Sequence, residues 1–463
     1  MKDLTQGPIG RHVVEMSIPI AVGMLLQTLY FLIDLYFVSR LGDAAIAGVS
    51  SAGTVFYAVM ALTQMLGVGT VSLMSHAVGR KDRPEANHIF NQSVLLAVLC
   101  AAITLVGGYA FAGAYMGIFA PDAPTRAAGV AFLHGYIPGM ALQFAMVVMG
   151  SALRGTGIVK PTMVVQMATV LLNAALAPVM IAGWGTGIAL GPAGAGWASS
   201  IAVAAGTLFL SFYFVKLESY VEFDRSQWHP KLATWKRMLN VGLPSGGEFL
   251  MLGVYSAVIY WIIRHFGAAA QAGFGIGGRV MQAVFLPAMA IAFAVPAIAG
   301  QNFGARQPGR VRETFRRAAI ASSAIMFALT LLVQWKGRAM VGAFTSDAAV
   351  ADFGFGFLKV ISWNFVAVGI VFTCSGMFQG LGNTWPSLIS TATRMLTFAI
   401  PGIWMSMRPG FQVEDLWHLS VATMLLQACF SYWLLRMQFR ERLDGLATPG
   451  VDPLHPASRR PAG

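Results

Sequence analysis

The sequence predicts an all-α integral membrane protein whose twelve transmembrane helices form two pseudo-symmetric lobes of six helices. The first observation behind this prediction is composition. The 463 residues are 56% hydrophobic and 11% charged, and their mean hydropathy of +0.66 does not fit a soluble domain of this length. Apolar runs of about 20 residues, the length of helix that crosses the hydrocarbon core, recur along the chain.

The second observation is an internal repeat at a spacing of 225 residues. Pro19 recurs as Pro244 and Asp122 as Asp347, and the copies match without a gap as far as Pro161. Paired repeats in membrane proteins usually flank a substrate site at their interface. Because each copy holds six helices, both copies have the same orientation and are related by an axis along the membrane normal.

Each predicted helix comes from one apolar run, and each lobe repeats the same order of boundaries. A proline lies near the cytoplasmic end of the first helix, and a Leu-Gly or Phe-Gly turn follows that helix. A basic cytoplasmic loop follows the second helix, an aspartate follows the third, and a Gly-x-Gly turn with a proline opens the fifth. In chain order the predicted spans are 14–39, 47–73, 91–119, 128–152, 161–183, 193–215, 238–264, 272–299, 316–341, 353–378, 386–407 and 416–438.

These boundaries predict an N-terminal lobe at 1–215 with helices 1–6 and a C-terminal lobe at 238–445 with helices 7–12. The charged stretch 216–237 is predicted to be a cytoplasmic linker between the lobes. The segment 446–463 has no apolar periodicity and is predicted to be a disordered cytoplasmic tail.

The net charge of +12 is concentrated on one side of the predicted membrane. Most Lys and Arg residues fall in the two termini and in the loops that follow even-numbered helices. By the positive-inside rule these regions, including both termini, are cytoplasmic. We expect a multi-pass protein of the plasma membrane, the inner membrane of a bacterium. The basic patches then serve topology and contacts with anionic lipid, and we exclude nucleic acid as a partner.

Two acidic residues, Asp34 and Glu248, fall well inside apolar spans. A carboxylate at that depth costs several kcal/mol of free energy, so such residues usually face a cavity and carry function. Gln27, Tyr30 and Asp34 are spaced by three and four residues and therefore share one helix face. Asp34 is thus a candidate for binding and releasing a proton or a cation.

The fifth predicted helix carries a similar polar face, made of Gln166, Thr169 and Asn173. Two such faces in one lobe predict a hydrated pocket within that lobe. Glu248 lies one turn after Pro244 in the seventh helix. It is predicted either to take part in the substrate cavity or to reach cytoplasmic water as a capping carboxylate.

Arg279 and Arg394 are cations within the eighth and eleventh helices, and each can pair with Glu248 or with backbone carbonyls. No nucleotide-binding loop and no cluster of metal ligands occurs in the sequence, so we predict no cofactor, no bound metal and no enzyme activity. The candidate substrate and cavity residues are Gln27, Tyr30, Gln166, Thr169, Glu248, Arg279 and Arg394.

The two copies of the repeat differ in their buried polar residues. At the spacing of 225, Asp34 corresponds to Ile259 and Asn173 to Phe398. We therefore expect the ion coupling of a transporter to belong to the first copy.

Four stretches of the sequence carry a family resemblance: residues 18–42, 154–161, 300–305 and 379–386. Together they resemble the multidrug and toxic compound extrusion (MATE) family, and the resemblance extends over about residues 10–438. It implies two six-helix lobes in a V-shaped arrangement, alternating access, and export of cationic or amphipathic drug-like molecules in exchange for H⁺ or Na⁺. The transporter is expected to be a monomer, and a flippase for a lipid-linked saccharide is the alternative within the same superfamily.

The resemblance also assigns ion coupling to Asp34, which matches the acid of the family's first helix. Asn173 matches the Asn of an Asn-x-x-x-Asp-Pro motif, in which Ala177 replaces the acid in this chain. Oxygen atoms of Asp34 and Asn173 can also hold Na⁺, so the coupling ion is either H⁺ or Na⁺. Glu248 lies one turn before the acid of the NorM-like branch, and the tenth helix has no acid, so the chain is closer to the DinF-like branch.

Overall fold

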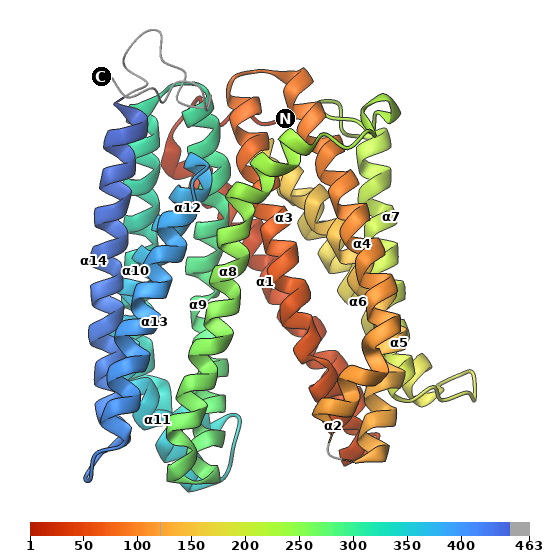
Figure 1. Cartoon of the computed structure of the whole chain (residues 1–463), viewed down its shortest axis with the longest axis vertical. Coiled ribbons are helices and arrows are strands. Elements are labelled where there is room, and N and C mark those ends of the chain that lie inside the picture. The colour runs from red at the N-terminus through yellow and green to blue at the C-terminus, as the bar shows by residue number, and fades with distance from the viewer. Residues whose placement is uncertain (121, 445–463) are drawn as a thin grey trace. The chain divides into compact units, whose positions relative to one another are not determined.

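A computed structural model describes residues 1–120 and 122–444, with the backbone alone at positions 31, 35 and 54. Within these ranges all regular structure is helical, as Figure 1 shows. The tail predicted at 446–463 lies outside the described residues. The all-helical fold agrees with the prediction from composition.

The described ranges contain fourteen α-helices and three short 3₁₀ turns. Eleven helical stretches among these residues are long and apolar enough to cross a membrane. The predicted span 386–407 also forms a helix, but its serines, threonines and arginine keep it out of that count. The helices are α1 (Ile9–Ser39), α2 (Asp43–Ala52), α3 (Thr54–Gly79), α4 (Arg83–Phe119), α5 (Ala123–Gly155), α6 (Lys160–Ala182), α7 (Pro192–Lys216), α8 (Leu232–Ile263), α9 (Ala268–Gly304), α10 (Pro308–Gly342), α11 (Ala348–Ile361), α12 (Phe365–Leu381), α13 (Trp385–Ser406) and α14 (Val413–Leu443).

Two predicted single helices are interrupted. The span predicted at 47–73 divides at Gly53 into α2 and α3, and the span predicted at 353–378 contains a 3₁₀ turn between α11 and α12. The apolar run continues across both breaks, so hydropathy alone does not detect them. Helix starts also differ: α4 begins before its apolar run because the Asp82 carboxylate accepts a hydrogen bond from the Glu85 N–H at 3.1 Å.

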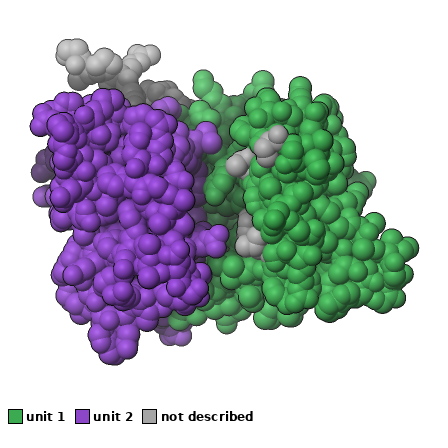
Figure 2. All heavy atoms as spheres, turned by 90° about the horizontal axis from the view of Figure 1, so that it is seen from below, with its two compact units in different colours: residues 1–3, 18–246 green, residues 4–17, 247–463 purple. Residues whose placement is uncertain are grey.

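The chain forms two compact units that do not follow chain order. Unit 1 holds residues 1–3 and 18–246, and unit 2 holds residues 4–17 and the described residues from Gly247 onward (Figure 2). Helices α1 and α8 therefore each pass from one unit to the other, close to Pro19 and Pro244. These prolines are equivalent in the repeat, so the two crossings occupy the same place in the two copies.

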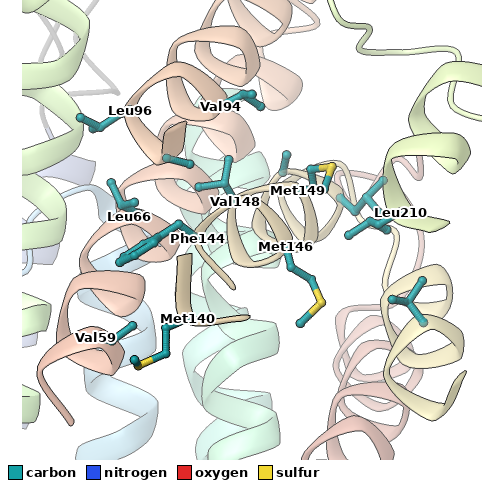
Figure 3. Packing of buried hydrophobic residues seen from close by; sticks show 14 of the residues in the cluster. Val59, Leu66, Val94, Leu96, Met140, Phe144, Met146, Val148, Met149 and Leu210 are labelled. Atoms are coloured by element: carbon teal, nitrogen blue, oxygen red, sulfur yellow. The ribbon is translucent and has the colours of Figure 1, made fainter. Parts of the chain in front are cut away.

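The core of unit 1 is built around α5. Its Phe144 and Val148 point toward Leu66 of α3, and its Met149 points toward Leu210 of α7 (Figure 3). Lipid tails are as apolar as these side chains, so helices in a bilayer associate mainly through close packing. Small residues allow this packing between α5 and α7, where a Cβ on Gly196 would overlap the carbonyl oxygen of Phe132.

The core of unit 2 contains a group of aromatic rings around Trp417 of α14, which is 2% exposed. The Trp417 ring lies 4.7 Å from that of Phe357 and stacks on that of Phe274 at 5.8 Å, measured between ring centres. The rings come from three helices, α9, α11 and α14. Aromatic pairs of this kind stabilise the packing of these three helices beyond the burial of their area.

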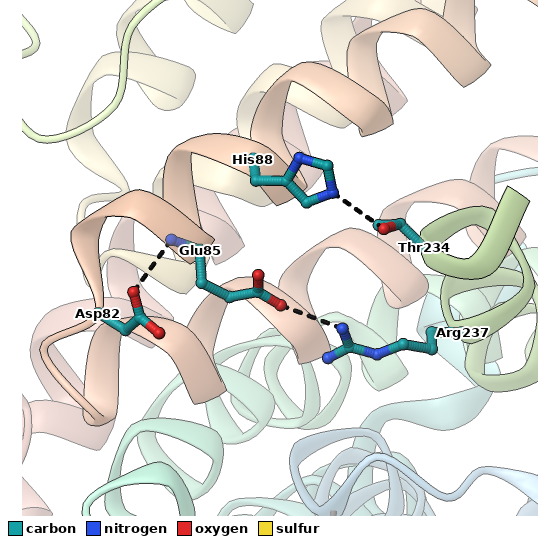
Figure 4. Close-up of polar contacts among 5 residues, drawn as sticks. All are labelled: Asp82, Glu85, His88, Thr234 and Arg237. Atoms are coloured by element: carbon teal, nitrogen blue, oxygen red, sulfur yellow. Dashed lines mark hydrogen bonds and ion pairs between the residues drawn. The ribbon is translucent and has the colours of Figure 1, made fainter. Parts of the chain in front are cut away.

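The predicted linker at 216–237 is docked on α4 of unit 1. Asn91 and Gln92 are fully buried, and their side-chain amides bond to the backbone between Glu222 and Lys231. The first turns of α8 bind the same helix: Arg237 pairs with Glu85 at 3.0 Å, and Thr234 lies 2.9 Å from a ring nitrogen of His88 (Figure 4).

Candidate functional site

Three helices of unit 1 bring a carboxylate and two neutral donors together. Asp34 of α1 accepts a hydrogen bond from Asn173 Nδ2 of α6 at 2.7 Å on its Oδ1 atom. Its Oδ2 atom accepts one from Ser199 Oγ of α7 at 2.9 Å. Asn173 is fully buried and Ser199 is 1% exposed. The two donors that stabilise the carboxylate charge are therefore shielded from water.

Two atoms of this cluster have capacity left for a ligand. The Asn173 Oδ1 atom is buried and accepts no hydrogen bond within the described part of the chain. The buried hydroxyl of Tyr30, one turn before Asp34, makes no well-directed hydrogen bond there, although it interacts with Ser199. Tyr30 and Tyr136 of α5 both lie within electrostatic reach of Asp34. The arrangement can hold a proton on the carboxylate or a small cation between its oxygens and the Asn173 carbonyl.

The remaining predicted residues of unit 1 are only partly brought to this cluster. Thr169 is buried on α6, but its hydroxyl donates to the Val165 carbonyl of the same helix at 2.8 Å. Gln166 is half-buried and Gln27 is exposed. The motif position taken by Ala177 is fully buried on α6, where a methyl group stands in place of the family's acid.

The equivalent positions of unit 2 are apolar. Ile259 is 4% exposed and Phe398 is fully buried, and both belong to the core cluster of that unit. The ring of Tyr255, which corresponds to Tyr30, lies 4.7 Å from that of Phe398 between ring centres. The repeat therefore keeps the tyrosine in both copies and replaces the acid–amide pair with hydrocarbon.

Glu248 of α8 has its own group of hydroxyl donors in unit 2. Ser387 Oγ donates to its Oε2 atom at 2.9 Å, and Thr391 Oγ1 donates to its Oε1 atom at 3.2 Å. Ser387 also lies 3.0 Å from the hydroxyl of Ser375 on α12. Within the described residues Glu248 forms no ion pair with Arg279 or Arg394, and its recorded contacts are with hydroxyl groups.

The two intramembrane arginines form no ion pair with that carboxylate within the described residues. Arg394 of α13 donates to the Tyr255 hydroxyl at 3.1 Å and stacks over its ring at 4.6 Å from the ring centre. Arg279 of α9 is exposed and forms no ion pair within the described ranges. Of the two, Arg394 alone joins a polar cluster.

A protein-family model matches this chain twice. The MatE model aligns with residues 19–179 and with residues 244–405, two stretches that begin 225 residues apart. The chain belongs to the MATE family. The double match has the spacing of the internal repeat, so both copies of the repeat match the same family model.

Curated relatives and solved MATE structures span nearly the same length. The multidrug export protein MepA of Staphylococcus aureus is 26% identical over 384 residues, which cover 82% of this chain and 83% of MepA. MepA of Staphylococcus saprophyticus is 24% identical over 81% of this chain and 82% of its own length. A MOP superfamily transporter from Pyrococcus furiosus has the same fold, with a TM-score of 0.89 at 23% identity over 96% of this chain and 98% of that one.

Sequence reasoning missed the donors that surround the two carboxylates. Ser199 follows the small-residue stretch of α7, where a serine does not stand out from its neighbours. Ser387 and Thr391 lie four residues apart on α13, and this spacing was the available signal. Which hydroxyl meets which acid depends on how the helices pack.

Proposed function

We propose that this MATE protein is a secondary active multidrug efflux transporter, which exports cationic or amphipathic compounds in exchange for H⁺ or Na⁺. The observation that carries the proposal is the contact of Asp34 with Asn173 and Ser199 inside unit 1. The names of the relatives, multidrug export proteins over more than four fifths of this chain, support the class of substrate.

Asp34 is proposed to alternate between a loaded and an empty state. When a proton or cation is bound, the site is neutral and its charge no longer has to be stabilised inside the membrane. When the ion leaves, the carboxylate depends on its two neutral donors, at a cost of several kcal/mol for a charge at that depth. An arriving cationic substrate relieves the same cost, so ion and substrate favour alternate occupancy. One charge moving inward gains about 2.3 kcal/mol per 100 mV of membrane potential.

The identity of the ion depends on how many oxygens meet it. Na⁺ requires several oxygen ligands, and the pair offers the Asp34 carboxylate and the free Asn173 Oδ1 atom. Ala177 removes a further carboxylate from the family motif, which favours H⁺ over Na⁺. Ile259 and Phe398 are apolar, which supports ion coupling in unit 1 alone. Coupling of this kind supports placing the chain nearer the DinF-like branch.

We further propose that the protein works as a monomer in the plasma membrane, with both termini in the cytoplasm. The basic residues near the starts of α4 and α10 support this orientation. Impermeant thiol labelling of single cysteines introduced at Lys81 and at Asp347 tests it. Labelling of Lys81→Cys in intact cells would contradict the orientation.

The test is efflux of a fluorescent cationic dye from proteoliposomes under separately imposed pH and Na⁺ gradients. Wild type should respond to one gradient, and Asp34→Asn should abolish that response while the protein stays monodisperse. Asp352→Asn, a change at an exposed acid paired with Arg338, is the matched control and should transport normally. Wild-type efflux by Asp34→Asn would refute the proposed role of Asp34. Flipping of a lipid-linked saccharide without dye efflux would replace the proposed substrate class.

A further inference from the structure

One surface of unit 1 is closed by the linker, and it can be compared with the equivalent surface of unit 2. Phe90 of α4 stacks on Phe214 of α7 at 4.6 Å between ring centres, and Phe223 of the linker contacts both rings at 5.2 and 6.0 Å. The next two residues of α4, Asn91 and Gln92, are fully buried, and their amides bind the linker backbone. This layer of unit 1 is therefore covered by the protein itself.

The repeat places the same pair of rings in unit 2. At the spacing of 225, the stacked rings of α4 and α7 correspond to Phe315 of α10 and Phe439 of α14, whose centres lie 6.3 Å apart. Both of these rings are only half-buried. The two buried amides correspond to Arg316 and Arg317, which are exposed. Among the described residues, the surface that the linker closes in unit 1 is thus open and positively charged in unit 2.

Arginines line the facing edges of α10 and α14. Arg312 of α10 forms an ion pair with Asp444 of α14 at 2.7 Å, so these two positions face each other. One turn further along α10, Arg316 lies on the same side of the helix as Arg312. One turn back along α14, Arg440 lies on the same side as Asp444, and Arg436 lies one turn before it. The two helices run in opposite directions, which places Arg316 and Arg440 at the same level.

Three of these arginines, Arg316, Arg436 and Arg440, have no acidic partner in the described part of the chain. All three are exposed, and none of them forms an ion pair or a hydrogen bond there. Like charges on neighbouring helices repel, and the repulsion grows where the dielectric constant falls below that of water, as it does at the edge of a membrane. An anion bound between the two helices would remove this cost, and the planar guanidinium suits a phosphate group best.

The same edge of unit 2 is apolar beyond the arginines. Ile320, Phe327 and Leu331 continue the face of α10 that begins with Arg316, and each of the three side chains is more than half exposed. Tyr432 of α14 is also exposed, and it stacks on the half-buried ring of α10 at 5.8 Å between ring centres. Tyrosine is enriched at the boundary between membrane and water, so the arginines lie at the level of lipid headgroups.

The chain does not supply the missing negative charge from its own C-terminal sequence. The segment 445–463 follows α14, as the linker follows α7, but it contains one acid, Asp452, and two arginines. Charge complementarity therefore favours an anion from outside the chain. At this level of a membrane, the anions available are the headgroups of acidic phospholipids in the cytoplasmic leaflet.

We propose that the facing ends of α10 and α14 bind one anionic phospholipid, with its phosphate between Arg316 and Arg440. The acyl chains of this lipid lie along Ile320 and Phe327, and Arg436 adds a third positive charge near the headgroup. The lipid thus covers in unit 2 the surface that the linker covers in unit 1. The proposal uses the membrane orientation proposed above, but it does not depend on ion coupling at Asp34.

The test is native mass spectrometry of the purified full-length protein in detergent, titrated with phosphatidylglycerol. Wild type should bind the first lipid saturably, with an affinity about tenfold or more above that for phosphatidylcholine, whose headgroup has no net charge. Glycerol phosphate, which lacks acyl chains, should not displace the lipid at millimolar concentration. Equal affinity for the two lipids would overturn the proposal. Displacement by glycerol phosphate would identify a free phosphate as the ligand and would overturn it as well.

Two double variants with the same change in net charge separate a defined site from diffuse attraction. The variant Arg316→Gln with Arg440→Gln should lower the affinity for phosphatidylglycerol by about tenfold or more and leave that for phosphatidylcholine unchanged. The matched control is Arg11→Gln with Arg225→Gln, which changes two exposed arginines outside this surface and should bind as wild type does. An equal loss of affinity in both variants would assign the binding to net charge and contradict a defined site.

Photochemical labelling locates the lipid in the folded protein. Phosphatidylglycerol with a photoreactive acyl chain should label α10 around Ile320 in wild type, and the label should be lost in the variant of Arg316 and Arg440. Labelling confined to other helices would overturn the proposal even if the affinities were as expected. Asp34→Asn should bind the lipid as wild type does, so failure of the efflux proposal and failure of this one are distinguishable.

Discussion

At the scale of single residues, both membrane carboxylates are held by neutral donors. Asp34 accepts from an amide and a hydroxyl, and Glu248 accepts from two hydroxyls. A neutral donor stabilises a carboxylate less than a guanidinium does. Breaking its hydrogen bond when a proton or cation binds the carboxylate therefore costs less free energy. An acid held in this way can change its charge within a transport cycle, whereas an acid in a buried ion pair resists that change.

Ser199→Ala tests the contribution of the third member of the unit 1 cluster. Loss of one hydrogen bond to a charged group costs about 1.5–3 kcal/mol, so the empty, anionic state of Asp34 becomes less favourable. The ion concentration for half-maximal dye efflux should therefore fall by about tenfold or more, because 1.4 kcal/mol corresponds to a factor of ten. Efflux rates in proteoliposomes at stepwise ion concentrations measure the change.

The matched control is Ser211→Ala, on the same helix. The Ser211 hydroxyl donates to the Thr207 carbonyl of its own helix at 2.8 Å and does not contact Asp34. This variant should keep the wild-type ion dependence. Equal shifts in the two variants would assign the effect to α7 as a whole and contradict a specific role for Ser199.

The candidate site was only half predictable from the sequence. Asp34 was identifiable because an acid deep in an apolar run is costly, and Asn173 because it matches a family motif. Ser199 was not identifiable, because a serine can bond to its own helix backbone and is common in membrane helices. Its role arises because α7 packs beside α6. The residue pattern along a single helix gives no information about that packing.

At the scale of elements, α8 shows how closely membrane helices pack in this protein. Its first half belongs to unit 1, where a Cβ on Gly242 would overlap the Met65 carbonyl oxygen of α3. The backbone oxygen cannot move aside as a flexible side chain would. Gly253, further along α8, has no atom within 4 Å of the place where its Cβ would lie.

Gly242→Ala should therefore lower the free energy of unfolding by about 1–3 kcal/mol, the usual cost of overpacking. Gly253→Ala should leave it unchanged or raise it by up to about 1 kcal/mol, because alanine is the better helix former. Thermal unfolding of both variants in the same detergent compares them. A more stable Gly242→Ala protein would show that α3 and α8 are not in contact at this position.

Helix ends were less predictable than helix centres, for a physical reason. Hydropathy marks the part of a helix that meets lipid, but hydrogen bonds at the termini decide where the helix begins. Asp82 starts α4 and Asp347 starts α11 by accepting from backbone N–H groups, in each case before the apolar run. The predicted spans therefore follow the chain order of the observed helices, but the first turns of α4 and α11 were missed.

At the scale of the whole molecule, each unit uses an equivalent position of the repeat to hold a segment of the chain in place. The side-chain contacts at the two positions differ. In unit 1, the loop between α3 and α4 leads to the ion pair of Glu85 with Arg237, which holds the start of α8. In unit 2, the equivalent loop between α9 and α10 leads to Arg310, which lies 225 residues after Glu85 and holds the N-terminal segment. Each anchored segment precedes the proline at which its helix passes to the other unit.

Arg310 makes the anchor of unit 2 through three hydrogen bonds. Its guanidinium donates to the carbonyl oxygens of Gly7 at 2.9 Å and Leu4 at 3.1 Å, and to the Asn302 side-chain oxygen at 2.8 Å. Leu4 is fully buried, and its N–H donates to the side-chain oxygen of Gln301 at 2.9 Å. The segment is thus fixed by backbone contacts that a shorter or uncharged side chain cannot reproduce.

Arg310→Ala should release this segment and lower the free energy of unfolding by about 2 kcal/mol, because partly buried carbonyls lose a charged donor. Hydrogen exchange of residues 4–7 should become faster, measured by mass spectrometry on the full-length protein. Arg312→Ala removes an arginine from the same helix, but its ion pair with Asp444 is exposed at both ends and should contribute about 0–1 kcal/mol. Unchanged exchange at residues 4–7 in Arg310→Ala would show that burial of Leu4 alone holds the segment. Faster exchange confined to Arg310→Ala would assign the anchor to the residue that the repeat places opposite Glu85.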